Sequence, residues 1–155
     1  GVGSTFTVEI PLELTEQVIP SEQKQHLQRD LTGIHVLMAE DNDLNAEIAE
    51  TVLVEAGIEV KRVEDGLQCI EELKKMPENY YDVILMDVQM PNMDGYTATQ
   101  RIRDLDDSRA EIPIIAMTAN AFTDDVQAAF DAGMNGHLAK PIDVEALYKT
   151  IARYI

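Results

Sequence analysis

Five short apolar runs, each followed by a stretch with helical periodicity, recur from residue 33 to the end of the chain. The runs start near residues 34, 58, 82, 112 and 135, so successive units take 24, 24, 30 and 23 residues. A unit of this length fits one strand, one helix and two short loops. The spacing therefore predicts an α/β fold, a doubly wound parallel sheet of five strands with right-handed helical crossovers.

The apolar pattern also predicts where the elements lie. Leu44, Ile48 and Val52 recur at helical spacing and predict the apolar face of a helix that ends at Gly57. The run 82–87 is continuously apolar between its two terminal acids, which is typical of a strand buried on both faces, whereas 58–63 alternates as an edge strand does. The other strands are expected at 34–39, 58–63, 112–117 and 135–139, and the later helices at 67–76, 95–105, 122–132 and 144–154.

The first 32 residues have a different character. Apolar residues alternate with polar ones from Phe6 to Leu14, which predicts a half-buried strand, and Pro11 confines that strand to a sheet edge or end. The polar stretch 15–32 reads as a linker. We therefore predict three parts: a strand over 1–14, a linker over 15–32 and a domain over 33–155.

Composition excludes several classes of protein. The chain has 12 basic and 29 acidic residues, a net charge of −17, whereas proteins that bind nucleic acid need a basic surface. No apolar run approaches the ~20 residues that span a bilayer, so we expect no direct membrane contact. The single cysteine, Cys69, cannot form an intramolecular disulfide and is expected in the core.

Polar side chains follow four of the five predicted strands. Glu40 and Asp41 follow the first strand, Asp87 ends the third, Thr118 follows the fourth and Lys140 follows the fifth. If the strand order is 2-1-3-4-5, these strand ends are neighbours and lie within roughly 15 Å at ~4.8 Å per strand. Three carboxylates in so small a volume repel one another, and a hard divalent cation such as Mg²⁺ relieves that repulsion.

Four motifs at these strand ends resemble one known family. Glu40-Asp41-Asn42, the run 86–95 (MDVQMPNMDG), Met117-Thr118-Ala119 and Lys140-Pro141 together resemble the receiver domain of two-component phosphorelay signalling. The resemblance covers 33–155. It implies a flavodoxin-like (βα)5 fold with the strand order 2-1-3-4-5.

The resemblance also implies a metal site and a nucleophile. Asp87 would be the phosphoacceptor and would attack phosphorus to form an aspartyl phosphate. Mg²⁺, with Mn²⁺ as an alternative, would be bound directly by Asp41, by Asp87 and by the backbone carbonyl of Gln89, and through water by Glu40. Lys140 would neutralise charge on the transferring oxygens.

Further roles follow from the resemblance alone. Thr118 would donate a hydrogen bond to the phosphoryl group, and His137 stands where many receivers have an aromatic switch residue. The implied roles of the remaining residues are control of the phosphoryl lifetime, for Gln89 and Asn120, and shaping of the loops, for Pro91, Gly95 and Pro141. The family usually has a cis bond before the proline that corresponds to Pro141.

The start of the chain carries a second resemblance. Residues 1–12 (GVGSTFTVEIPL) resemble the closing segment of a histidine kinase ATP-binding domain. Followed by a linker and a receiver, this segment implies a hybrid sensor histidine kinase. The implied partners are the kinase's phosphohistidine (dimerisation) domain and a histidine phosphotransfer domain. The implied location is the cytoplasm, in a parent attached to the inner cell membrane. The fragment should bind no nucleotide.

Other functions fit the same residues less well. A stand-alone response regulator would share the receiver but not the kinase-like start. A phosphatase of the haloacid dehalogenase type needs a second aspartate two residues after its nucleophile, and Gln89 stands there. A flavin site needs a loop that cradles phosphate, which Glu40 and Asp41 would repel. Whether the chain is itself an enzyme stays open, because the resemblance implies a phosphoacceptor that promotes its own phosphorylation and dephosphorylation.

Overall fold

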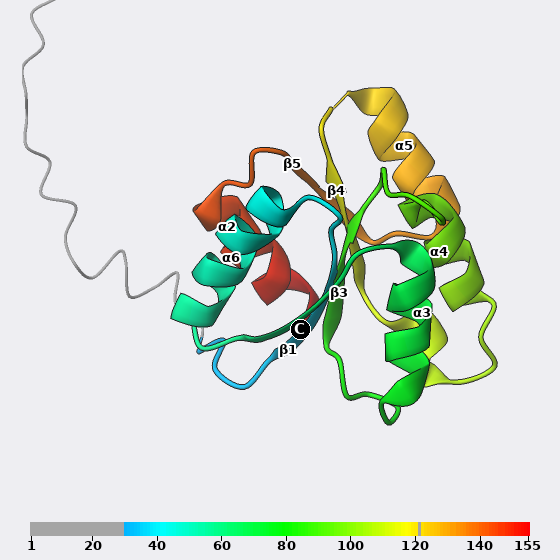
Figure 1. The fold of residues 1–155 in the computed structure, drawn as a ribbon, viewed down its shortest axis with the longest axis horizontal. Helices are drawn as coiled ribbons and strands as arrows, with labels where there is room; N and C mark the ends of the chain where they lie inside the picture. Colours follow the sequence, from blue (N-terminus) through cyan, green and yellow to red (C-terminus); the bar gives the residue numbers. More distant parts are fainter. Residues whose placement is uncertain (1–29, 121) are drawn as a thin grey trace, which may run out of the picture.

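The fold is a single parallel sheet with helices on both faces (Figure 1). The computed structural model describes residues 30–120 and 122–155, so the strand predicted over 1–14 and most of the linker lie outside the described residues. The strands are β1 (His35–Ala39), β2 (Glu59–Val63), β3 (Val83–Asp87), β4 (Ile114–Thr118) and β5 (Gly136–Ala139). Their order is β2-β1-β3-β4-β5, which confirms the predicted fold class and strand order.

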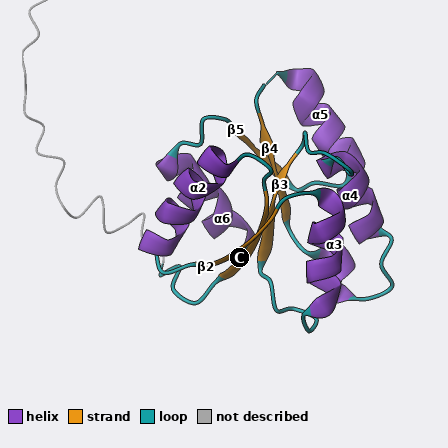
Figure 2. Ribbon diagram, in the orientation of Figure 1, coloured by secondary structure: helices purple, strands orange, loops and turns teal. Residues whose placement is uncertain are grey.

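The helices divide between the two faces of the sheet (Figure 2). The helices are α2 (Asp43–Glu55), α3 (Gly66–Lys75), α4 (Gly95–Arg103), α5 (Thr123–Ala132) and α6 (Val144–Tyr154), with a 3₁₀ turn, η1 (Ser108–Glu111), before β4. In both ribbon views α2 and α6 cover one face and α3, α4 and α5 cover the other. Each face has its own apolar core, and Cys69 is buried in the core under α3. Every residue of β3 is buried, as its apolar run predicts. None of the described helices is long and apolar enough to cross a bilayer.

The buried face of α2 differs from the predicted one. Leu44 is 65% exposed and Ile48 is 49% exposed, while Ala46, Ala49 and Leu53 are buried. The prediction that Leu44 and Ile48 face the core was therefore wrong. The side chains that pack also follow helical spacing, and two of them are alanines, which let the helix axis lie close to the sheet. Periodicity alone could not separate these two overlapping stripes.

The start of β4 also differs from its predicted position. The strand begins at Ile114 rather than at residue 112, because η1 occupies Ser108–Glu111 and Asp107 caps it by accepting from the Arg109 amide. Pro113 has no amide hydrogen, but its carbonyl accepts a hydrogen bond from the Ile84 amide at 2.9 Å. The sheet pairing therefore starts through a carbonyl, and the regular strand follows it.

Polar residues fix the starts of four helices. The side chains of Asn42, Asp65, Asp94 and Asp143 each accept a hydrogen bond from an amide in the first helical turn. This bond satisfies an amide that has no partner within the helix. Three of these four residues are acids whose carboxylates cap helices, so fewer acidic side chains remain free to bind a ligand.

The first described residues already pack against the domain. Leu31 is buried in the core between the sheet and the helices α2 and α6. The Gly33 amide donates to the Gly57 carbonyl at 3.0 Å and ties this entry to the turn before β2. The last residues of the predicted linker thus contribute to the packed body.

Candidate functional site

A cleft of about 260 Å³ opens at the carboxyl ends of β1, β3, β4 and β5. The sheet order places these four ends side by side, as the strand-end argument predicts. The residues that line the cleft include Glu40, Asp41, Asp87, Val88, Gln89, Thr118, Asn120 and Lys140.

The three carboxylates predicted to meet do meet. One oxygen from each of Glu40, Asp41 and Asp87 lies within 4.8 Å of the other two. Glu40 is 1% exposed and Asp87 is 5% exposed, whereas Asp41 is open to solvent. Negative charges this close, two of them removed from water, raise the free energy of the folded protein unless a cation offsets them.

Lys140 supplies one of the required cations. Its Nζ lies 2.6 Å from Glu40 Oε2 and 3.0 Å from Asp87 Oδ2. The Lys140 amide donates to the Thr118 carbonyl at 2.8 Å, and the peptide bond to Pro141 is cis. Burial lowers the pKa of Lys140, but hydrogen bonds and attraction from the two carboxylates outweigh burial and raise it. The side chain is therefore an ammonium over the whole physiological pH range.

The surroundings of Asp87 raise the pKa of its carboxyl group. Burial is the largest influence and raises the pKa of Asp87 from 3.8 to about 6. The hydrogen bond from Lys140 acts in the opposite direction, and the charge of Glu40 raises the pKa further. The Gln89 amide donates to Asp87 Oδ1 at 3.1 Å, so that a backbone donor and the ammonium hold the two carboxylate oxygens.

The predicted switch residues lie in two different environments. Thr118 is buried at the end of β4, and its hydroxyl donates to the Asn120 carbonyl at 2.6 Å. Asn120 itself is exposed at the mouth of the cleft. His137 is exposed on β5 and does not line the cleft. Their roles in switching and in phosphoryl lifetime stay predictions.

The loop after Asp87 turns at a residue that we did not single out. Asn92 adopts the left-handed conformation, with φ 62°, while Pro91 is exposed in the same loop. Gly95 is the first residue of α4, and glycine is required there because a side chain would not fit. A Cβ atom at Gly95 would overlap the backbone carbonyl oxygen of Asp87 and would lie 2.9 Å from Met86 Cγ.

Three residues at the site were missed in the sequence. Arg62 on β2 donates from Nε to the Glu40 carbonyl at 3.0 Å and pairs with Asp43 Oδ1 at 2.8 Å. Tyr96 and Asp125 line the cleft, and the pKa of Tyr96 is raised by burial and then by the charges of Asp125 and Asp94. In the sequence Arg62 lies in an alternating edge strand, and this pattern gives no sign that its side chain reaches the end of β1.

The donor set of the cleft fits a hard divalent cation. Carboxylate oxygens and backbone carbonyls are the ligands that Mg²⁺ prefers, and the described residues that line the cleft include no sulfur or imidazole group. Glu40 Oε2 is buried, and among the described residues the Lys140 ammonium lies 2.6 Å from it. A carboxylate oxygen has two lone pairs, so one contact with an ammonium leaves room for a second partner.

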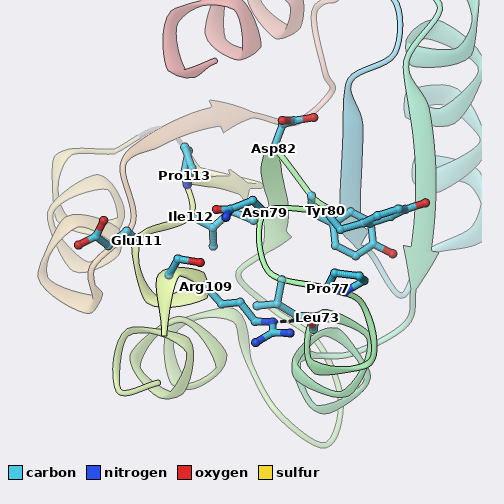
Figure 3. Close-up of a pocket in the computed structure, with 11 residues that line it drawn as sticks. Leu73, Pro77, Asn79, Tyr80, Asp82, Arg109, Glu111, Ile112 and Pro113 are labelled. Carbon is cyan, nitrogen blue, oxygen red and sulfur yellow. Dashed lines mark hydrogen bonds between the residues drawn. The ribbon is translucent and has the colours of Figure 1, made fainter. Parts of the chain in front are cut away.

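A second pocket, of about 310 Å³, lies at the opposite end of the sheet and is lined by Arg109 (Figure 3). The Arg109 side chain donates to the Leu73 carbonyl at 3.0 Å and to the Met76 carbonyl at 2.6 Å, and it pairs with Asp107. Each of its three nitrogens therefore has a partner. Arg109 donates to carbonyls at the end of α3, and no nitrogen of its side chain is left without a partner to bind an anion.

Comparison with known proteins connects the cleft to a family. The family model described as the response regulator receiver domain matches residues 36–152. The peroxide stress-activated histidine kinase mak1 of Schizosaccharomyces pombe is 43% identical over 75% of the chain, and the sensor histidine kinase RcsC of Salmonella typhi is 33% identical over 96%. The chain spans only 7% and 15% of these two relatives.

Solved structures give the same result. The receiver domain of the sensor histidine kinase PA1611 from Pseudomonas aeruginosa, with magnesium in its active-site cleft, is 38% identical, with a TM-score of 0.71 over 79% of this chain and 98% of its own. The receiver domain of the response regulator Ssk1 from Saccharomyces cerevisiae, solved with the histidine phosphotransfer protein Ypd1, is 30% identical, with a TM-score of 0.73 over 80% of this chain and 90% of its own.

Proposed function

The chain belongs to the response regulator receiver domain family, and from this premise we propose that Asp87 accepts a phosphoryl group from a phosphohistidine. One observation carries the proposal. Asp87 ends the central strand with its carboxylate between a partly buried ammonium, Lys140, and two further carboxylates, Glu40 and Asp41. A nucleophilic carboxylate with cationic partners and a place for a hard cation is the equipment that phosphoryl transfer needs.

Phosphoryl transfer exchanges the bond from histidine to phosphorus for a bond from Asp87 to phosphorus. A carboxylate oxygen of Asp87 forms a bond to phosphorus while the bond between phosphorus and the histidine nitrogen breaks. The electron pair of that bond stays on the histidine nitrogen, and the ring leaves as neutral imidazole when its other nitrogen carries a proton. The ammonium of Lys140 offsets charge on the phosphoryl oxygens. The Thr118 hydroxyl would exchange the Asn120 carbonyl for a phosphoryl oxygen. Asp41, Asp87 and the Gln89 carbonyl would hold Mg²⁺, with Glu40 bound through water. When bound, this ion supplies neutralisation of the transferring oxygens.

A small phosphodonor tests the proposal directly. Acetyl phosphate with Mg²⁺ should place one phosphoryl group on the chain, detectable by intact-protein mass spectrometry and removable by hydroxylamine, which attacks acyl phosphates. Removal of the metal with a chelator should prevent the reaction. A phosphoryl group that resists hydroxylamine, or one that forms equally well with the chelator present, would contradict an aspartyl phosphate that depends on a metal.

The raised pKa of Asp87 predicts how Mg²⁺ affinity depends on pH. The metal binds the ionised carboxylate, and in the metal-free protein Asp87 ionises only above a pKa of about 6. The dissociation constant should therefore be flat above pH 7 and should rise toward a limit of about tenfold per pH unit below pH 6. Isothermal titration calorimetry from pH 5 to 8 measures it, and binding at pH 5.5 should release a proton. Equal affinity at pH 5 and 7 would contradict this prediction.

The exposed face of α2 is proposed as the surface that receives the phosphotransfer domain. Leu44 and Ile48 are separated by one helical turn, and Asn45 beside them lines the cleft. Exposed apolar residues next to a site where a histidine must approach are suited to a helical partner. The similar Ssk1 receiver was solved in complex with a histidine phosphotransfer protein, which supports a phosphotransfer domain as the kind of partner.

Replacing Leu44 and Ile48 with glutamate should separate docking from chemistry. The double variant should lose at least about tenfold in the rate of transfer to or from a histidine phosphotransfer domain, because two charges replace an apolar contact. Its rate of phosphorylation by acetyl phosphate should stay within about twofold of wild type, because neither side chain enters the cleft.

The control is Val54→Glu, which adds one glutamate charge, against two in the double variant, at an exposed position on the same helix. Val54 is 62% exposed but lies two turns or more from the cleft end of α2. Its transfer rate should equal that of wild type. An equal loss in Val54→Glu would show that charge alone, and not the Leu44–Ile48 surface, causes the effect.

We propose further that the chain is part of a hybrid sensor histidine kinase. The similarity to RcsC covers 96% of the chain and so extends beyond the receiver into the first 29 residues. In that setting the phosphohistidine domain of the kinase is the donor, the receiver is cytoplasmic, and the parent is attached to the cell membrane. A phosphatase of the haloacid dehalogenase type is not favoured, since Gln89 stands where its second aspartate is needed.

A further inference from the structure

We propose that Asp65 and Asn92 form a positioning link that fixes the β3–α4 loop, and with it the Gln89 backbone, against the cleft. This inference rests on the proposed function, because it concerns the metal site of the same cleft. Neither residue touches the cleft, so each would act through the loop. The link joins two segments 27 residues apart in the sequence.

The hydrogen bond joins a buried carboxyl group, that of Asp65, to the exposed side chain of Asn92. Asn92 Nδ2 donates to Asp65 Oδ2 at 2.9 Å, and Asp65 is 5% exposed. The other carboxylate oxygen, Oδ1, accepts from the Gln68 amide at 2.8 Å and caps α3. A buried carboxyl group whose two oxygens each accept a hydrogen bond holds both partners, because a buried acceptor that loses its donor raises the free energy of the folded protein.

The loop needs such a hold at Asn92. Its φ of 62° is in the left-handed region, which asparagine tolerates better than most residues but does not prefer. The neighbouring turn is closed by the Met93 amide, which donates to the Pro91 carbonyl at 2.7 Å. The side-chain bond to Asp65 therefore holds the one residue of the loop whose backbone conformation is least favourable.

The backbone also connects the start of α3 to the β3–α4 loop. The Gly66 amide donates to the Met93 carbonyl at 3.1 Å. A Cβ atom at Gly66 would lie 2.8 Å from that carbonyl oxygen and 2.7 Å from Ala98 Cβ. The start of α3 thus lies directly against the loop. Two consecutive residues of this segment, Asp65 and Gly66, contact two consecutive residues of the loop, Asn92 and Met93.

Hydrogen bonds at both ends of the loop connect Asn92 to the residues of the cleft. Its first part is fixed to the nucleophile, since the Gln89 amide donates to Asp87 Oδ1, and its end is fixed by the Gly95 amide, which donates to the Val88 carbonyl at 3.0 Å. Between these points the loop rests on the start of α3. Release of Asn92 would let the Gln89 carbonyl move away from the position where it would bind the metal.

A swapped pair tests the link. Asn92→Asp places a carboxylate against Asp65 and should weaken Mg²⁺ binding about tenfold, the factor expected for one lost hydrogen bond to a charged group. The double variant Asp65→Asn with Asn92→Asp rebuilds the bond with donor and acceptor exchanged, and the amide oxygen introduced by Asp65→Asn can still cap α3. Mg²⁺ affinity in the double variant should return to within about twofold of wild type.

The control is Asn79→Asp, which makes the same change at the other left-handed asparagine, φ 61°, beside the second pocket (Figure 3). Calorimetric Mg²⁺ titration and thermal melting should be measured for all four proteins, with phosphorylation as a separate readout. The control should bind Mg²⁺ as wild type does.

Three outcomes would overturn the link: wild-type affinity in Asn92→Asp, tighter binding there through added negative charge, or a double variant as weak as the single. If Asn92→Asp does not fold, Asp65→Ser, which keeps a capping hydroxyl but cannot reach Asn92, should show the same tenfold loss, and wild-type affinity in it would overturn the link. If wild type binds Mg²⁺ but is never phosphorylated, the proposed function fails while the link remains tested by affinity.

Discussion

Asp87→Asn is expected to abolish phosphorylation by acetyl phosphate, with a loss of at least about 10³-fold in rate. The amide that replaces the carboxylate has no negative charge and is a poor nucleophile, so the bond to phosphorus cannot form. It also removes one of the direct metal ligands implied for the site. Intact-protein mass spectrometry after incubation with acetyl phosphate and Mg²⁺ measures the loss.

The same variant should not lose stability, which separates loss of chemistry from loss of fold. Burial raises the pKa of Asp87 to about 6, so the ionised form at pH 7 destabilises the metal-free folded state. Neutral asparagine removes that cost. In the absence of Mg²⁺ its melting temperature at pH 7 should therefore equal or exceed that of wild type. Phosphorylation that persists in Asp87→Asn would show that another residue is the acceptor.

Gly95→Ala is expected to damage both stability and the site. The added methyl group would overlap the carbonyl oxygen of Asp87 and crowd Met86 Cγ at 2.9 Å. Backbone at the end of a fully buried strand cannot move aside easily, so the free energy of unfolding should fall by roughly 1–3 kcal/mol. Relief of the overlap would displace Asp87, and the phosphorylation rate should fall about tenfold or more.

Gly33→Ala provides the control for this prediction. Gly33 has φ 82°, but a Cβ atom there would have none of the described atoms within 4 Å. Its replacement should cost about 1–2 kcal/mol of stability through backbone strain alone. The rate of phosphorylation should not change, because Gly33 precedes the amino end of β1, whereas Asp87 lies at the carboxyl end of the parallel strand β3. Denaturant unfolding and the acetyl phosphate assay applied to both variants distinguish general destabilisation from displacement of the nucleophile.

Local sequence patterns predicted the elements well, and their limits are instructive. Apolar runs located β1, β3 and β4, because a strand buried on both faces needs a continuous apolar run, whereas the edge strands β2 and β5 are exposed on alternate residues. The pattern on α2 was ambiguous, since Leu44 and Ile48 share helical spacing with the stripe of Ala46, Ala49 and Leu53 that packs. Which stripe faces the sheet depends on the fit of side chains against another element, and this fit is absent from the local sequence.

Contacts between distant segments were the least predictable part of the site. Arg62 reaches from β2 to the Glu40 carbonyl at the end of the neighbouring strand β1, and Asp65 reaches Asn92 from a different crossover. In the sequence Arg62 has the pattern of a solvated strand residue, and Asp65 has that of a helix cap. The cap is real, but the second oxygen of the carboxylate has a partner that only the packed loop supplies.

The sequence by itself determined the five strand–helix units, the residues at the strand ends and, through the four receiver-like motifs, the family of the chain. These follow from local chemistry, since hydrophobic periodicity selects secondary structure and parallel topology collects the strand ends at one edge. The tertiary structure alone decided how close the carboxylates lie, which face of α2 stays exposed, and how Asp65 and Gly95 hold the loop around Asp87. Those features depend on distances of a few ångströms between segments far apart in the chain, and such distances are set only when the whole core packs.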